Sequence, residues 1–174
     1  MSYEAAKAII ARAHSVGVNF INTAVVYRRG LSEDFIGRAL RELKIQRDEV
    51  VIATKIPGDF LSPDDVFKAV DGSLRRLGVS TIDLLQLHWP PCWHNFPTNL
   101  YARSLERLIV MGKVSYTGVS NYPVTLIEEL RSSFSFTDIV SMRYQFNLIE
   151  RWAEVELIPY AEANIPWSPL AKDY

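Results

Sequence analysis

The sequence predicts an α/β fold in which parallel strands alternate with helices. Two apolar runs, 50–54 and 82–87, show no regular alternation of polar and apolar residues, which is typical of strands covered by helices on both faces. Amphipathic helical stretches separate such runs, in the order expected of βαβ units. Polar residues end several of the runs, which favours a (β/α)8 barrel of the TIM type over a doubly wound sheet. The sequence contains no Gly-x-Gly-x-x-Gly, which weakens the doubly wound alternative.

Six helices and six strands are expected in alternation. Ser2 can cap the first helix and Gly17 can close it in the left-handed conformation, after which residues 18–21 form a strand. Ser32 precedes apolar residues at helical spacing, which indicates a second helix before the strand 50–54.

The later elements begin with a strong helix signal. Ser62 followed by Pro63 is typical of a helix start, and Gly78 stops this third helix before the strand 82–87. The remaining elements expected are a helix that contains Leu105 and ends before Gly112, a strand at 114–120, a helix opened by Pro123, a strand at 139–142, a helix at 155–163 and a short strand at 165–167.

Length and composition exclude several classes of protein. A chain of 174 residues is long enough for one domain and short for two, so residues 1–174 are interpreted as a single domain. A formal charge of −1 argues against nucleic acid as a partner. No apolar run is long enough to span a bilayer and no signal peptide is recognised, so we expect a cytoplasmic protein. The only cysteine, Cys92, is interpreted as a spare thiol, and no metal site is predicted.

Three polar side chains end or follow apolar runs. Tyr27 stands a few residues after the strand that ends near Asn22, Lys55 follows the run 50–54, and His88 follows the run 82–87. Because the carboxyl ends of parallel strands meet at one rim, we expect these side chains to converge. Taken singly, each is more readily a loop tyrosine, a salt-bridged lysine or a core histidine, but the three together in this order favour a shared site.

A set of motifs in order extends this pattern. They read FINTAxxY, VIATK, SLRRLGVSTIDLLQLHWP, GKVxxxGVSN, NLIER and WSPLA, and they run from residue 18 to residue 171. In this the chain resembles the aldo/keto reductase family. The resemblance implies a (β/α)8 barrel that reduces aldehydes and ketones with a nicotinamide dinucleotide, NADP(H) ahead of NAD(H), through an Asp, Tyr, Lys, His tetrad.

The resemblance assigns roles to individual residues. Tyr27 matches the proton donor, Lys55 the lysine that lowers its pKa, and His88 the histidine that orients the carbonyl. This chemistry suits the residue types, because hydride addition leaves charge on the carbonyl oxygen that a phenol can protonate and an imidazole can hydrogen-bond. The cofactor-binding positions implied are Ser120, Asn121, Trp167, Ser168 and Leu170. Trp89, at the start of a loop that also holds Trp93, His94 and Phe96, is expected to contact substrate.

Two site positions depart from the family pattern. Asn22 stands where the family has the aspartate that pairs with the lysine. A lysine without that partner acts more strongly on Tyr27 while charged, yet burial without a counter-ion favours its neutral form, and the sequence does not decide between these effects. Arg143 stands where the family has a glutamine that binds the nicotinamide, and a guanidinium cannot accept a hydrogen bond from the carboxamide.

The family pattern is also incomplete in length. The connection between 162–164 and Trp167 is short, the family's first strand and its cofactor-phosphate segment have no counterpart, and an incomplete barrel of about six strands is expected. Its open edges predict self-association or loop collapse. We therefore expect weak cofactor binding and impaired reduction of carbonyl compounds. The alternatives left open are a catalytically silent nucleotide-binding or interaction module and an inactive gene fragment.

Overall fold

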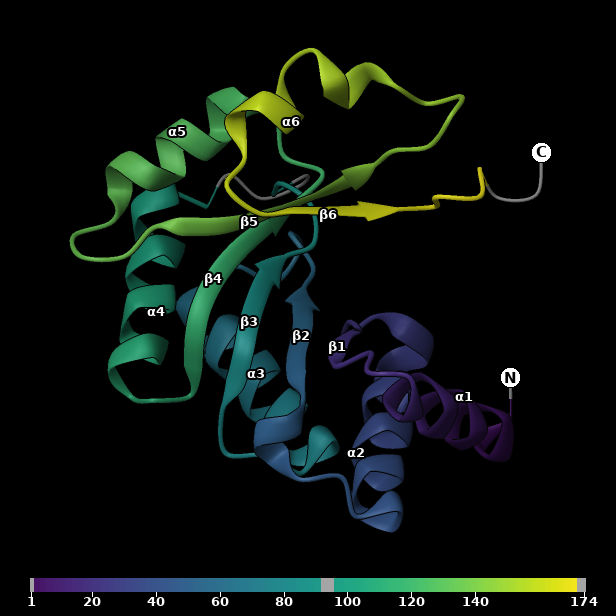
Figure 1. The fold of residues 1–174 in the computed structure, drawn as a ribbon. Helices are drawn as coiled ribbons and strands as arrows, with labels where there is room; N and C mark the ends of the chain where they lie inside the picture. The colour runs from purple at the N-terminus through teal and green to yellow at the C-terminus, as the bar shows by residue number, and fades with distance from the viewer. Residues whose placement is uncertain (1, 92–95, 172–174) are drawn as a thin grey trace.

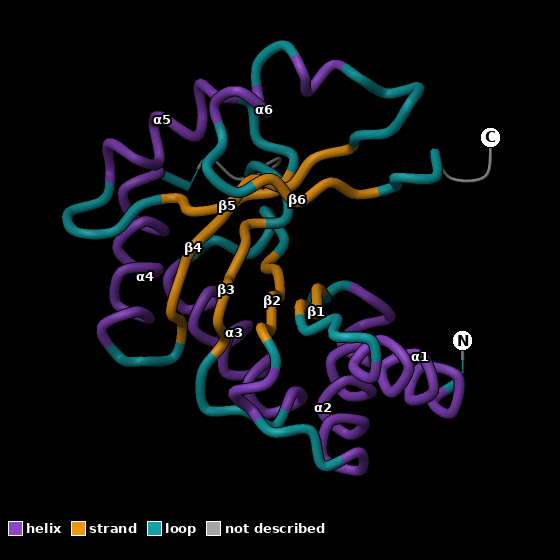
Figure 2. The backbone as a smooth tube through the Cα atoms, viewed as in Figure 1, coloured by secondary structure: helices purple, strands orange, loops and turns teal. Residues whose placement is uncertain are grey.

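The fold is one curved sheet of parallel strands with helices along its outer side (Figure 1, Figure 2). The computed structural model of the chain describes residues 2–91 and 96–171. Within these residues the strands are β1 (Phe20–Asn22), β2 (Val51–Ile56), β3 (Ile82–Leu87), β4 (Val114–Ser120), β5 (Ile139–Gln145) and β6 (Asn164–Trp167). The α-helices are α1 (Tyr3–Ser15), α2 (Leu31–Leu43), α3 (Pro63–Leu77), α4 (Thr98–Val110), α5 (Val124–Ser133) and α6 (Leu157–Tyr160). The predicted alternation is confirmed.

The sheet is an incomplete barrel. Its strands pair in sequence order from β1 to β6, all in parallel, and each helix from α1 to α5 packs against the next. In the described part of the chain β1 pairs only with β2 and β6 only with β5, so the sheet keeps two open edges. The expected barrel-type fold with about six strands is therefore confirmed.

Helix ends follow the predicted caps in most places. The Ser62 hydroxyl accepts a hydrogen bond from the Asp65 amide (3.2 Å), and Pro63 is the first residue of α3. Gly78 ends α3 with a φ of 69°, the left-handed conformation that glycine adopts without strain.

None of the helices among residues 2–91 and 96–171 is long and apolar enough to cross a membrane.

Some predicted boundaries were wrong. Helix α2 begins at Leu31 after Gly30, so Ser32 lies in its first turn, and the Ser32 hydroxyl accepts a hydrogen bond from Thr23 Oγ1 (2.9 Å). The helix expected over 155–163 is a 3₁₀ turn (Trp152–Glu154) followed by the four-residue α6. Extended backbone at Ala161 ends α6, and Val155, whose burial the longer helix needed, is 86% exposed.

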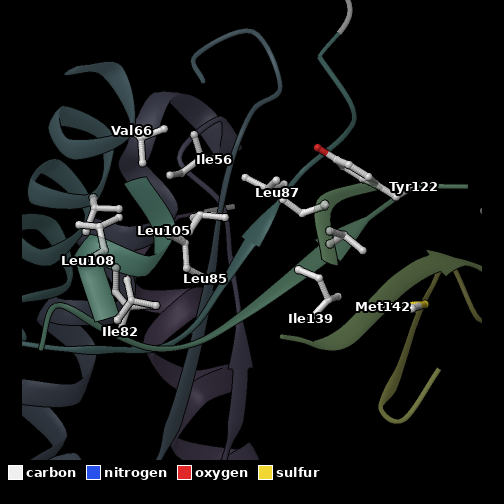
Figure 3. Packing of buried hydrophobic residues seen from close by; sticks show 14 of the residues in the cluster. Ile56, Val66, Ile82, Leu85, Leu87, Leu105, Leu108, Tyr122, Ile139 and Met142 are labelled. Carbon is white, nitrogen blue, oxygen red and sulfur yellow. The ribbon is translucent and has the colours of Figure 1, made fainter. Parts of the chain in front are cut away.

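The main core lies between the sheet and its helices. Figure 3 shows Leu105 and Leu108 of α4 beside Ile82 and Leu85 of β3, and all four are almost completely buried. These residues are the apolar members of the runs that predicted a helix and a strand. Burial of such a side chain contributes roughly 1.5–3 kcal/mol, so this layer fixes where the ends of the strands lie.

The inner face of the sheet carries a polar row. Lys55, Gln86, Gly118 and Ser141 are successive register partners across β2 to β5, and the three with polar side chains are buried. Gln86 Nε2 donates to Ser141 Oγ (3.2 Å), across the glycine. A Cβ on Gly118 would lie 2.2 Å from Ser141 Oγ, so the row needs a glycine between these two residues.

Candidate active site

The three predicted catalytic side chains meet at the C-terminal ends of neighbouring strands. Lys55 belongs to β2, His88 directly follows β3, and Tyr27 begins a 3₁₀ turn after β1. Lys55 Nζ lies 4.9 Å from the centroid of the Tyr27 ring. The Tyr27 and His88 ring centroids are 5.7 Å apart and the rings are nearly perpendicular. The convergence expected from the strand ends is therefore present in the fold.

Backbone pairing explains this convergence. The chain continues to pair with β2 beyond β1, because the Thr23 amide donates to the Ala53 carbonyl (2.9 Å) and the Val25 amide to the Lys55 carbonyl (3.2 Å). The His88 amide donates to the Ile56 carbonyl (2.8 Å) in the same way. These bonds hold the start of both loops against β2.

Lys55 is fully buried, and no carboxylate in the described part of the chain pairs with it. Its Nζ donates to Asn22 Oδ1 (2.5 Å) and to the Thr23 carbonyl oxygen. Burial, and secondly the positive charge of Arg143, lower the pKa of Lys55 to about 7, against a smaller opposite effect of Glu33. Of the two effects that the sequence left open, burial is therefore the larger. At neutral pH a substantial fraction of this lysine is uncharged.

A buried amide chain supports Asn22. Asn22 Nδ2 donates to Gln86 Oε1 (3.3 Å), and Gln86 in turn donates to Ser141. The sequence analysis missed Gln86 and Ser141, although a polar residue inside a mainly apolar run such as 82–87 or 139–142 is a usable signal. It also missed Thr23, because the contributing atom is a backbone oxygen and leaves no side-chain pattern.

His88 is buried beside these groups. Its Nδ1 atom has no hydrogen-bond partner among the described residues. Burial first, and then the charges of Lys55 and Arg143, lower the pKa of His88 to about 4. The imidazole is therefore neutral at neutral pH, the state in which one ring nitrogen donates a hydrogen bond and the other accepts one.

The opposite wall consists of residues from β4 to β6 and the turn that follows. Asn121, which has a left-handed φ of 59°, donates from Nδ2 to the His88 carbonyl (3.0 Å) and to Ser120 Oγ (3.1 Å). The Trp167 indole nitrogen donates to Asn121 Oδ1 (3.1 Å). Asn121 thus connects the histidine loop to the tryptophan of β6.

Arg143 also lies on this wall. Its guanidinium carbon is 6.0 Å from the centre of the Trp167 ring, and burial lowers its pKa. Among the described residues no carboxylate lies within 4.0 Å of its side chain. Within the described residues, Arg143 is thus a partly buried cation that faces an aromatic ring and is not paired with a carboxylate.

A cleft of about 420 Å³ joins the two walls. Its lining residues are Tyr27, His88, Asn121, Arg143, Trp167 and Ser168. Ser120 is fully buried behind the cleft, and Leu170 is 82% exposed outside it. Trp89 stacks on His88 with ring centroids 4.5 Å apart, and its indole nitrogen donates to Asp59 Oδ2 (3.0 Å), so its polar edge faces the β2–α3 loop. Cys92, Trp93 and His94 lie outside the described residues.

The family model for the aldo/keto reductase family matches residues 1–173. The chain belongs to this family. Aldo-keto reductase AMT2 of Alternaria alternata is 32% identical over 202 residues, with 94% of this chain and 54% of that protein covered. Versiconal hemiacetal acetate reductase of Aspergillus parasiticus is 31% identical, with 94% of this chain and 56% of that protein covered. The chain spans about half the length of these relatives.

Solved structures of the family share this fold. An aldo/keto reductase from Klebsiella pneumoniae, solved with NADP and acetate, superposes with a TM-score of 0.86 at 26% identity, covering 98% of this chain and 59% of that one. The described residues therefore share both the fold and the sequence motifs of the family.

The cleft residues fit the nicotinamide end of such a cofactor. Trp167 offers an aromatic ring, Ser168 and Asn121 offer polar atoms, and the volume of about 420 Å³ is within the range of small-molecule sites. Arg143 lies over the Trp167 ring. Unlike the glutamine that the family pattern has at this position, it brings a positive charge to the same wall. The cleft can therefore accommodate the nicotinamide end of the cofactor, with the positive charge of Arg143 beside it.

Proposed function

We propose that this chain is an oxidoreductase that reduces aldehydes or ketones to alcohols with a reduced nicotinamide dinucleotide. The observation that carries the proposal is that Tyr27 and His88 meet at a cleft whose other wall contains Trp167, with the buried Lys55 Nζ 4.9 Å from the centre of the Tyr27 ring. Family membership supports it, because the residues that converge are those at the family's motif positions.

NADP(H) is proposed ahead of NAD(H). The support is indirect, from the Klebsiella pneumoniae reductase that was solved with NADP. Asn121, Trp167 and Ser168 of the cleft wall are proposed to hold the nicotinamide end, with Arg143 beside them. Ser120, buried behind the cleft, is proposed to act through Asn121, and Leu170, outside it, to lie near the pyrophosphate. Trp89, which packs on His88, is proposed to lie on the substrate side. When bound, the cofactor supplies the hydride for the carbonyl carbon.

The chain's own residues then handle the proton. The Tyr27 hydroxyl donates a proton to the carbonyl oxygen, and the neutral His88 donates a hydrogen bond to the same oxygen. A charged Lys55 near the Tyr27 ring favours the phenolate that remains. Because the pKa of Lys55 is lowered to about 7, this help is incomplete at neutral pH, and we propose that turnover is impaired there.

Oxidation of NADPH in the presence of 4-nitrobenzaldehyde tests the proposal. Tyr27→Phe is expected to lower kcat by about 100-fold or more, since general acid catalysis contributes about that much. Tyr116→Phe, at a tyrosine on β4 that is 60% exposed, is the matched control and should keep the rate. NADPH binding without any turnover in the unchanged chain would instead support the silent nucleotide-binding alternative, and absence of both would reject the function.

Three further statements belong to this proposal. Residues 1–174 form one domain, because the six strands make one sheet, and a single cooperative melting transition tests this. The chain associates with itself through the open edges of that sheet. The third statement is that the protein lies in the cytoplasm. Fractionation of cells that express the chain tests it.

A further inference from the structure

Arg143 gives the cleft a positive charge that no carboxylate among residues 2–91 and 96–171 pairs with. Its six lining residues include one arginine and no aspartate or glutamate. Within the described residues the acid that acts on Lys55 from nearby is Glu33, and both its oxygens are already engaged, one by Thr54 Oγ1 (2.6 Å) and the other by Arg76 Nε (2.7 Å). No protein carboxylate of the described chain therefore balances Arg143.

The neighbours of Arg143 show the same imbalance. The positive charges of Arg143 and Lys55 both lower the pKa of His88, and the charge of Arg143 also lowers the pKa of Lys55. A partly buried guanidinium is strongly stabilised by an anion that accepts two parallel hydrogen bonds from its fork. The cleft thus has a positive charge, a guanidinium among its lining side chains and the space for a small planar anion.

We propose that Arg143 makes this cleft a carboxylate-binding site and that the carbonyl substrates of the chain are 2-oxo acids. The substrate assignment rests on the proposed function, whereas the carboxylate site does not. Arg143 and Tyr27 line the same cleft and interact electrostatically. A carboxylate held by Arg143 would therefore leave the adjacent carbonyl group at Tyr27 and His88.

The chemistry of such a substrate is balanced. The C2 carbon of the 2-oxo acid gains a hydride from the reduced nicotinamide, and its oxygen gains the Tyr27 proton, so the product is a 2-hydroxy acid. The short link between carboxylate and carbonyl in a 2-oxo acid suits two side chains that line the same small cleft. Arg143 is a binding and specificity residue in this scheme, not a proton donor.

Calorimetric titration with oxamate, a 2-oxo acid analogue that is not reduced, tests the site without cofactor. Oxamate should bind, and the uncharged ester ethyl oxamate should bind at least about 10-fold more weakly. Arg143→Gln should weaken oxamate binding by about 10- to 100-fold, because a charge-assisted hydrogen bond is lost. Arg143→Lys should be intermediate, since a lysine keeps the charge but not the fork. Arg103→Gln, at an exposed arginine of α4, is the matched control and should bind as the unchanged chain does.

Three outcomes would overturn the proposal. They are equal binding of oxamate and its ester, equal binding of oxamate by the Arg143→Gln chain, and tighter binding of inorganic phosphate than of oxamate, which would assign the charge to a phosphate group. The ester comparison uses the unchanged chain, so it stands even if a variant does not fold. NADPH titration of the same proteins separates the two proposals, because oxamate binding without NADPH binding would reject the function and keep the carboxylate site.

Discussion

At the scale of single residues, the state of Lys55 controls what the cleft can do. It is fully buried, and its hydrogen-bond acceptors, Asn22 Oδ1 and the Thr23 carbonyl, are both uncharged. A charged lysine in this position has lost water without gaining a counter-ion from the described residues. The same residue therefore weakens the fold when protonated and weakens the proposed catalysis when neutral.

Stability should rise with pH because of Lys55. The folded-state pKa is lowered from 10.5 to about 7, so between these values the unfolded chain binds a proton that the folded chain does not. The destabilisation is thus fully present below about pH 7 and is relieved toward pH 10.5, a change on the order of a few kcal/mol. Lys55→Met should flatten this slope in thermal melts. Lys68→Met, at an exposed lysine of α3, should leave it as it is, and a Tm that falls over this range in the unchanged chain would contradict the argument.

His88 should add a second rise at lower pH. Its pKa is lowered from 6.5 to about 4, so the unfolded chain binds the extra proton between these values. Stability should therefore also increase from about pH 4 to 6.5, and His88→Gln should remove this part of the slope while keeping the Lys55 part. Urea unfolding at several pH values separates the two contributions, and a His88→Gln chain with an unchanged acid slope would refute this assignment.

Asn22→Asp should shift the pH dependence of the proposed turnover. A carboxylate at the atom that now accepts from Lys55 Nζ raises the pKa of the lysine toward its ordinary value. In the unchanged chain kcat should increase as pH falls through about 7, where Lys55 becomes charged. In the Asn22→Asp chain the midpoint should move up by about one unit or more, measured at saturating NADPH. Asn99→Asp, at an exposed residue at the start of α4, is the control, and an unmoved midpoint would show that another group is titrating.

The sequence predicted the convergence of the three candidate catalytic residues for a physical reason. Polar residues at the ends of apolar parallel strands share one rim, so Tyr27, Lys55 and His88 could be placed together without coordinates. What Arg143 contacts could not be predicted in this way, because its position over Trp167 depends on a rotamer and on the β5–β6 register. The pKa of Lys55 likewise depends on burial, which no local pattern gives.

At the scale of elements, the contact between α2 and α3 needs a glycine. A Cβ on Gly37 would lie 2.4 Å from the Leu77 carbonyl oxygen and 2.5 Å from that of Arg76, both backbone atoms. Gly37→Ala should therefore push the two helices apart and destabilise the fold by roughly 1–3 kcal/mol, the usual cost of overpacking. Gly72→Ala in α3 is the matched control, because its Cβ would meet the far end of the Arg76 side chain at 3.0 Å and helix propensity favours alanine by about 1 kcal/mol. Urea unfolding should rank Gly37→Ala below the unchanged chain and Gly72→Ala at or above it, and the reverse order would disprove the close-contact argument.

Element types were more predictable than element ends. Local signals such as Ser62-Pro63 and Gly78 act within one helical turn, and they were read correctly. The region 155–163 was predicted as one helix from its apolar residues. Packing decides such cases, and here Val155, the first of those residues, is exposed to solvent.

At the scale of the whole molecule, the sheet has two open edges, because no strand of the described chain pairs with the outer side of β1 or of β6. The strand order from β1 to β6 followed from the βαβ pattern, because each crossover places the next parallel strand beside the last. What covers the outer edges of β1 and β6 does not follow from that pattern. Beside β1 lies a mainly apolar cleft of about 420 Å³ lined by residues of α1, β1 and α2.

Self-association through the β1 edge is the last prediction. Phe20 of β1 is 38% exposed and Ile9 of α1 is 58% exposed, so apolar side chains and unpaired backbone groups lie on the same side of the molecule. Sedimentation velocity should therefore show a concentration-dependent dimer. Phe20→Lys should weaken this dimer by about 10-fold or more, because a lysine at the edge must lose water to be covered. Val110→Lys, at the end of α4 and 74% exposed, places the same charge on another face and should leave the dimer intact. A compact monomer at all concentrations, with one cooperative melting transition, would show that the edges are closed within a single chain.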